Sequence, residues 1–101
     1  MIEVDVVKAL KAIEELKVEM LKAQWTFQQG TVNGSEPEML QGLADVVALS
    51  YLLTRRLGFD FSKLDRTLLQ RLEGWKANDK IKLETQWGDL SLLISYLAPE
   101  E

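Results

Sequence analysis

Apolar residues recur every three or four positions along the N-terminal segment, and this spacing constrains the fold more than any other feature. The stripe consists of Val6, Leu10, Ile13, Leu16, Met20, Ala23 and Phe27. No Pro or Gly interrupts the segment from Glu3 to Gln29. Since residues three and four positions apart share one face of an α-helix, the spacing predicts a long amphipathic helix.

Turn-forming residues mark the end of this helix and both ends of the next one. We expect a first loop over residues 30–35, which is rich in Gly, Asn, Thr and Ser. Ser35 is a suitable N-cap for a second helix, because acids and Pro37 follow in the first turn. This helix should run to about Leu57, where Gly58 can stop it.

The C-terminal part of the chain predicts two further helical segments. The stripe of the first is Phe61, Leu64, Leu68, Leu72 and Trp75, and that of the second is Leu83, Trp87, Leu90, Ile94 and Leu97. Asn78 or Asp79 can cap the later segment, and Gly88 can break it. No repeat or strand-like alternation is present. The sequence therefore predicts an all-α fold in one domain over residues 1–101, with four helices, or five if Gly88 breaks the last.

Composition excludes several kinds of site. The 101 residues include no Cys and no His, so a thiolate metal site, a serine-type triad and most zinc sites are excluded. Any metal must be held by oxygen, as magnesium, calcium or manganese are. The net charge of −4 argues against binding DNA or RNA through a broad basic surface.

The ends and apolar runs of the sequence bear on location. Residues 1–5 are acidic where a signal peptide would be basic, and the longest apolar run is too short to cross a bilayer. We therefore expect a cytoplasmic protein that does not enter a membrane.

Asp45 is the single charge in the apolar run from Leu43 to Leu53. A buried carboxylate is costly unless it is paired, hydrogen-bonded or metal-bound, so Asp45 requires a partner if this helix is buried. Glu38, Gln41 and Asp45 share one side of the second helix, and nearly all other positions are apolar. Such a helix is either central to a monomeric bundle or covered by a partner subunit, and we expect a homodimer or larger homo-oligomer.

Three acids deserve comparison as ligands of a cation. Glu15 lies among lysines opposite the apolar stripe, as expected of a solvent-exposed side chain. Glu19 lies closer to the stripe and is better placed to face another helix. Asp45 is either a hydrogen-bonded acid at a helix crossing or a ligand that faces Glu19, since acids on two packed helices commonly form metal sites in bundles.

Basic residues are candidates for binding phosphate. Arg55 and Arg56 end the second helix, where arginines also serve as helix-dipole partners. Lys76, with other bases along the third helix, could neutralise a triphosphate or could simply face solvent. These residues give a weaker signal than the acids.

Two sets of segments resemble a known family. Residues 14–19, with Glu14, Glu15 and Glu19, and residues 42–47, with Asp45, resemble the MazG family of nucleotide pyrophosphohydrolases. Residues 51–58 and 83–93 resemble the short MazG-like proteins of bacteria more closely. The resemblance implies an all-α fold that self-associates. It also implies magnesium held by two acidic pairs, and hydrolysis of a nucleoside triphosphate to the monophosphate and pyrophosphate.

Only half of the implied ligand set is present. Glu19 and Asp45 match one acid of each pair, whereas Leu16 and Gly42 stand where the partner acids would be. Glu15 and Glu38 are weaker substitutes because neither is in register. We therefore expect a nucleotide- or protein-binding module with weak or no catalysis. The alternative is a magnesium-dependent pyrophosphohydrolase in which two carboxylates and the substrate phosphates hold the metal.

Overall fold

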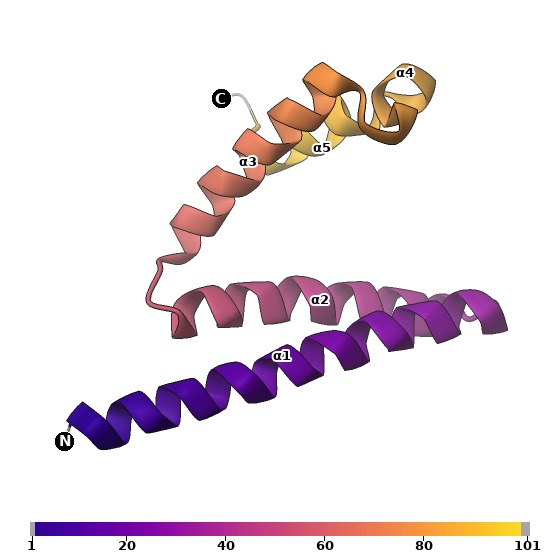
Figure 1. The fold of residues 1–101 in the computed structure, drawn as a ribbon. Helices are drawn as coiled ribbons and strands as arrows, with labels where there is room; N and C mark the ends of the chain where they lie inside the picture. The colour runs from indigo at the N-terminus through magenta and orange to yellow at the C-terminus, as the bar shows by residue number, and fades with distance from the viewer. Residues whose placement is uncertain (1, 100–101) are drawn as a thin grey trace. The chain divides into compact units, whose positions relative to one another are not determined.

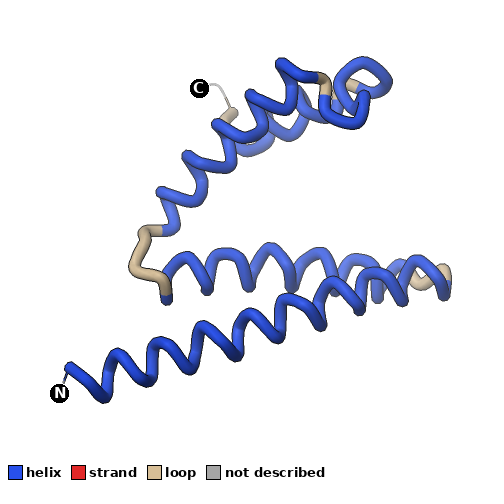
Figure 2. Tube along the Cα trace, viewed as in Figure 1, coloured by secondary structure: helices blue, strands red, loops and turns tan. Residues whose placement is uncertain are grey.

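A computed structural model describes residues 2–99, and in this range the chain forms helices and no strand (Figures 1 and 2). The helices are α1 (Ile2–Asn33), α2 (Glu36–Arg56), α3 (Phe61–Asn78), α4 (Leu83–Trp87) and α5 (Asp89–Leu97), with a short 3-10 helix, η1 (Lys80–Lys82). The predicted all-α class is confirmed, and so is the break at Gly88, whose φ is 69°. The chain divides into two compact units, Met1–Phe61 and Ser62–Glu101. The single domain stays a prediction.

The turn between α1 and α2 is shorter than the sequence indicated. The predicted loop over residues 30–35 is wrong for its first four residues, which continue α1 to Asn33. Gly34 adopts a φ of 63°, and the Ser35 N–H donates to the Gly30 carbonyl at 2.9 Å, as in a Schellman motif. Ser35 then caps α2 as predicted, since its hydroxyl accepts from the Glu38 N–H at 3.4 Å.

Two glycines let α1 and α2 approach closely. A Cβ built on Gly42 would lie 2.5 Å from the backbone nitrogen of Phe27, and one on Gly30 would lie 2.6 Å from that of Met39. Both glycines are buried. Gly30 is thus a helical residue, and it lacks a side chain because α2 packs against its Cα. It does not form the turn that its residue type suggested.

The first helix extends beyond its partner in the hairpin. α1 has 32 residues and α2 has 21, a difference of 32 − 21 = 11 residues, or about 16 Å of helix at ~1.5 Å per residue. Because the two helices are joined by a short turn, the excess falls at the N-terminal end of α1 (Figure 1). Val6, Val7 and Leu10 in this overhang are 50%, 64% and 58% exposed.

The second unit buries leucines. Leu72 of α3 is 2% exposed and Leu90 of α5 is 3% exposed. Between these helices the backbone is strained, since Asp79, Ile81 and Lys82 have φ values of 51°, 56° and 61°. For residues with a Cβ this left-handed conformation costs about 1–2 kcal/mol each, and it is least favourable for β-branched Ile81.

Two carboxylates hold this strained segment by capping the helices that follow it. Asp79 accepts from the backbone N–H groups of Glu84 and Thr85 at 3.1 and 3.2 Å, and from the Thr85 hydroxyl. Glu84 accepts from the Ser91 N–H at 2.9 Å and from the Ser91 hydroxyl. The Thr85 hydroxyl is the main cause that lowers the pKa of Asp79, and the Ser91 hydroxyl does the same for Glu84. Asp79 stands at the N-cap position of η1, whereas the N-cap position of α4 is occupied by Lys82. The predicted cap is therefore present through the Asp79 carboxylate, which accepts from N–H groups in the first turn of α4, and not through an N-cap residue of that helix.

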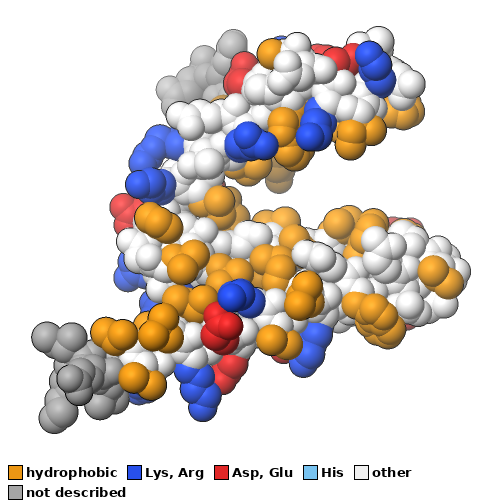
Figure 3. All heavy atoms as spheres, viewed as in Figure 1, with side chains coloured by type: hydrophobic (Ala, Val, Ile, Leu, Met, Phe, Trp, Pro, Cys, Tyr) orange, Lys and Arg blue, Asp and Glu red, His pale blue; other side chains and the backbone are white. Residues whose placement is uncertain are grey.

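Large apolar side chains reach the surface along the hairpin (Figure 3). On α2, Leu40, Leu43 and Val47 are 57%, 47% and 57% exposed. This helix was predicted to be apolar on most sides, and α1 covers only some of those sides. These side chains do not amount to a membrane segment: within residues 2–99, no helix has both the length and the apolar content to cross a bilayer.

Candidate functional site: an acidic pocket between α1 and α2

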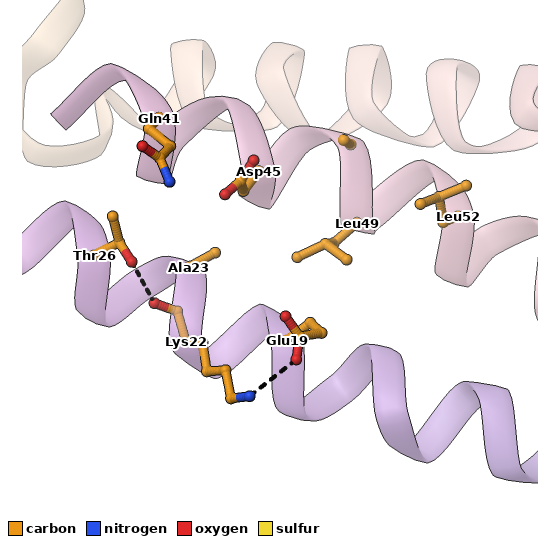
Figure 4. A pocket seen from close by; sticks show the side chains of 9 residues that line it. Glu19, Lys22, Ala23, Thr26, Gln41, Asp45, Leu49 and Leu52 are labelled. Carbon is orange, nitrogen blue, oxygen red and sulfur yellow. Dashed lines mark hydrogen bonds and ion pairs between the residues drawn. The ribbon is translucent and has the colours of Figure 1, made fainter. Parts of the chain in front are cut away.

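The α1–α2 hairpin contains a pocket of about 470 Å³ that both helices line (Figure 4). The lining residues are Glu19, Lys22, Ala23 and Thr26 from α1, and Gln41, Asp45, Ala48, Leu49 and Leu52 from α2. Glu19 and Asp45, the two acids that match the family pattern, thus line the same pocket from opposite helices. Ala23 is 4% exposed and forms its floor at the helix crossing.

Asp45 is exposed in this structure, which corrects the expectation of a buried acid. The Gly42 side of α2 packs against α1, and Asp45 lies at the edge of that contact, where the pocket opens. We find no hydrogen bond or ion pair from its carboxylate among the described residues. The hydrogen-bonded acid at a helix crossing, one of the two interpretations of Asp45, therefore finds no partner in the described part of the chain, and the exposed carboxylate is solvated instead.

Glu19 has a partner on its own helix. The Lys22 ammonium lies 3.1 Å from Glu19 Oε2, and the two side chains are 68% and 53% exposed respectively (Figure 4). Pairs at i,i+3 on an exposed helix face contribute only a few tenths of a kcal/mol. The pair matters more for the charge of the pocket than for the stability of α1.

The weaker acidic candidates lie outside this pocket. Glu15 is exposed, as its position among lysines predicted. Glu38 lines a neighbouring hollow of about 350 Å³ near the turn, and it accepts from the Asn33 amide at 3.4 Å. That hollow also contains Trp25 and Gln29 and shares Thr26 and Gln41 with the acidic pocket.

Packing explains why position 42 offers no ligand. Gly42 is buried, and a Cβ there would lie 2.8 Å from both Cα and Cβ of Phe27, in addition to its 2.5 Å contact with the Phe27 nitrogen. A carboxylate side chain at this position would displace α1. Leu16, at the other missing position, is half-buried and apolar.

The residues that line the pocket do not supply enough oxygen ligands to hold, by themselves, the magnesium that the resemblance implies. Magnesium takes six oxygen ligands in near-octahedral geometry and is usually bound by one or two carboxylates with waters and substrate phosphates. Here two carboxylates, a hydroxyl and an amide share the lining with an ammonium group. Among the described residues, no group of three or more acidic side chains is arranged to hold a metal.

The basic candidates are not among the residues that line the pocket, although Leu52 of the lining lies one turn before Arg55 and Arg56 on α2. Arg55 and Arg56 are in the last turn of α2, ten and eleven residues beyond Asp45, or about 15 Å along the helix at ~1.5 Å per residue. Arg56 lines a different hollow of about 430 Å³ with Asp5, Lys8, Ala9 and Ala12. Lys76 belongs to the second unit, where its charge helps to lower the pKa of Glu84.

Sequence reasoning missed Lys22 and Thr26 as lining residues, although a signal was present for each. Lys22 follows Glu19 by one turn, and Thr26 follows Lys22 by one more turn, so all three share a helix face. Gln41 was placed with Asp45 by the same argument, and the structure confirms that they line one pocket.

Helices that hold acids across a shared pocket define a class of all-α proteins with a potential cation site. In a comparison with known sequences, a MazG-like family model matches residues 6–90 of the 101. The protein belongs to the MazG-like family, and the match includes both Glu19 and Asp45. No curated protein and no solved structure matches the chain.

Proposed function

We propose that this MazG-like protein is a binding module with weak or no catalysis. The observation that supports this most directly is the ligand set of the acidic pocket. Glu19 and Asp45 are the acids that line it, and the close approach of Phe27 to Gly42 leaves no room for a third carboxylate at that position. A protein that hydrolyses a triphosphate needs strong charge compensation on the phosphates, and this pocket supplies little of it.

The partner we favour is a second copy of the chain. A second, exposed apolar series runs along α1: Val7, Val18, Leu21, Trp25 and Val32 are 50–77% exposed. Trp25 of this series also lines the hollow that α1 shares with Glu38 and Gln41 of α2. From Val18 onward the spacing of three, four and seven residues matches the heptad of helices that pack together. Exposed apolar surface of this regularity is typical of an interface between proteins.

Sedimentation equilibrium tests the assembly. We expect a homo-oligomer at micromolar concentrations, and Leu21→Lys should shift it toward monomer because a charge would be desolvated in the interface. Leu57→Lys is the control, since Leu57 is 55% exposed but follows α2 and lies outside the series. A wild-type protein that remains monomeric at 100 micromolar, an order-of-magnitude limit for a specific assembly, would contradict this part of the proposal.

The second candidate is a magnesium-dependent nucleoside triphosphate pyrophosphohydrolase. It is favoured by one observation, which is that Glu19 and Asp45 line the same pocket. Incubation with magnesium and a panel of nucleoside triphosphates, followed by measurement of pyrophosphate, distinguishes the two. We expect no release above the Asp45→Asn background, and no shift of the thermal midpoint on adding magnesium. Release that Asp45→Asn abolishes would establish the hydrolase instead.

A further inference from the structure

The acidic pocket contains a positive charge of its own. Lys22 lines the pocket together with Glu19 and Asp45, and its ammonium is 3.1 Å from Glu19 Oε2. These three are the charged residues of the lining, so its formal charge is −2 + 1 = −1. Without Lys22 the two carboxylates would give a formal charge of −2, so the ammonium weakens the electrostatic attraction of the lining for a divalent cation.

The ion pair also occupies an oxygen atom of Glu19 that could otherwise bind a metal ion. One carboxylate oxygen of Glu19 accepts from the ammonium (Figure 4). A divalent cation bridging Glu19 and Asp45 would have to displace Lys22 from this oxygen, or bind with the ammonium a few ångströms away. Both alternatives weaken binding, the first by breaking an ion pair and the second by repulsion between like charges.

We propose that Lys22 is the resident counter-ion of this pocket and that it disfavours divalent cations there. This inference deepens the proposed function and rests on its account of the pocket as a degenerate metal site. Lys22 thereby determines the specificity of the pocket, because its charge decides whether the remaining two carboxylates are available to a metal.

The chain contains a matched control for this idea. Lys17 pairs with Glu14 at 2.9 Å with the same i,i+3 spacing and similar exposure, 60% and 69%. Neither residue lines the acidic pocket. Lys17→Gln changes the net charge of α1 by the same amount as Lys22→Gln, and Lys and Gln have similar helix propensities, so both variants should fold.

The experiment is a titration with Mn²⁺, without nucleotide, in which electron paramagnetic resonance measures the free ion. We expect Lys22→Gln to bind Mn²⁺ about two- to fivefold more tightly than wild type, the range set by the strength of an exposed ion pair. Lys17→Gln should match wild type, and Lys22→Arg should also match it because the charge is retained. Adding Asp45→Asn to Lys22→Gln should remove the gain.

Two outcomes would overturn the inference. The first is equal affinity, or equal absence of binding, in wild type and Lys22→Gln. The second is a gain in Lys17→Gln as large as that in Lys22→Gln, which would assign the effect to net charge alone. Neither outcome depends on hydrolysis: pyrophosphate release by wild type would refute the proposed function while the comparison of Mn²⁺ affinities stands by itself.

Discussion

The two units of the protein bury side chains of opposite size. In the hairpin of α1 and α2 the buried positions are Ala23, Gly30 and Gly42, whereas in the second unit they are Leu72 and Leu90. The hairpin is therefore held by the close approach of two backbones, and the second unit by leucine side chains and two carboxylate caps. Added side-chain atoms at the buried positions should therefore destabilise the first unit, and removed side-chain atoms should destabilise the second.

The largest expected effect is truncation in the second unit. Leu72→Ala should lower the free energy of unfolding by about 2–5 kcal/mol, because it removes buried methyl groups and leaves a cavity beside a side chain that is 2% exposed. Urea denaturation followed by circular dichroism measures the change. A loss below about 1 kcal/mol would mean that the surroundings of Leu72 collapse into the space.

The converse change in the hairpin adds a single methyl group. Gly42→Ala should cost about 1–3 kcal/mol, because the new Cβ would lie 2.5 Å from the Phe27 nitrogen and force α1 and α2 apart. The same denaturation experiment applies. Unchanged stability would show that the two helices separate without cost, and the comparison between the units would then fail.

A third glycine supplies the control and a smaller effect of opposite sign. Gly74 lies inside α3, and a Cβ there would meet no atom within 4 Å. Gly74→Ala should therefore raise the free energy of unfolding by about 0.5–1 kcal/mol through helix propensity alone. A destabilised Gly74→Ala variant would indicate that a partner covers this face of α3.

The smallest expected effect concerns the carboxylate caps at acid pH. Hydrogen bonds lower the pKa values of Asp79 and Glu84 below their ordinary 3.8 and 4.5 in the folded state. Groups with lowered folded pKa values stabilise the fold fully above the unfolded values, and this contribution is lost as the pH falls through the folded values. The thermal midpoint of wild type should fall more steeply below about pH 4.5 than that of Asp79→Asn/Glu84→Gln.

Asn is a fair replacement at position 79 because it tolerates the left-handed backbone there. The control is Glu73→Gln, which changes an exposed acid on α3. If Glu73→Gln reduces the dependence of the thermal midpoint on pH as much as the double variant does, the two caps are not the specific cause of the loss of stability in acid.

The helices were predictable from sequence because their signals are local. Apolar spacing located α1 and α3, and the cap signals at Ser35 and Gly58 bounded α2. The structure also confirms the break at Gly88. Gly30 was misjudged because turn chemistry and close helix packing both select glycine, and only the position of α2 separates them.

The two acids of the candidate site could be predicted from the sequence, but the exposure of Asp45 and the presence of Lys22 in the pocket could not. Glu19 and Asp45 follow from family motifs and helix geometry. The exposure of Asp45 depends on which face of α2 packs against α1, and the sequence of α2, apolar on most sides, does not reveal that face. The role of Lys22 was hidden because a lysine near a glutamate is ordinary on any solvent-exposed helix face.

The unequal lengths of α1 and α2 have a consequence for hydrogen exchange. A helical segment of about eleven residues is marginal in water without tertiary packing. The overhang shares a hollow with Arg56 but extends beyond the end of α2. Its amides near Lys8 and Leu10 should therefore exchange by local fraying, while those near Ala23 and Phe27 exchange only when the hairpin opens. One geometrically continuous helix would thus show two levels of protection. Uniform protection of the amides along α1 would instead indicate that another surface covers the overhang. The exposed apolar series begins in this part of the helix, at Val7.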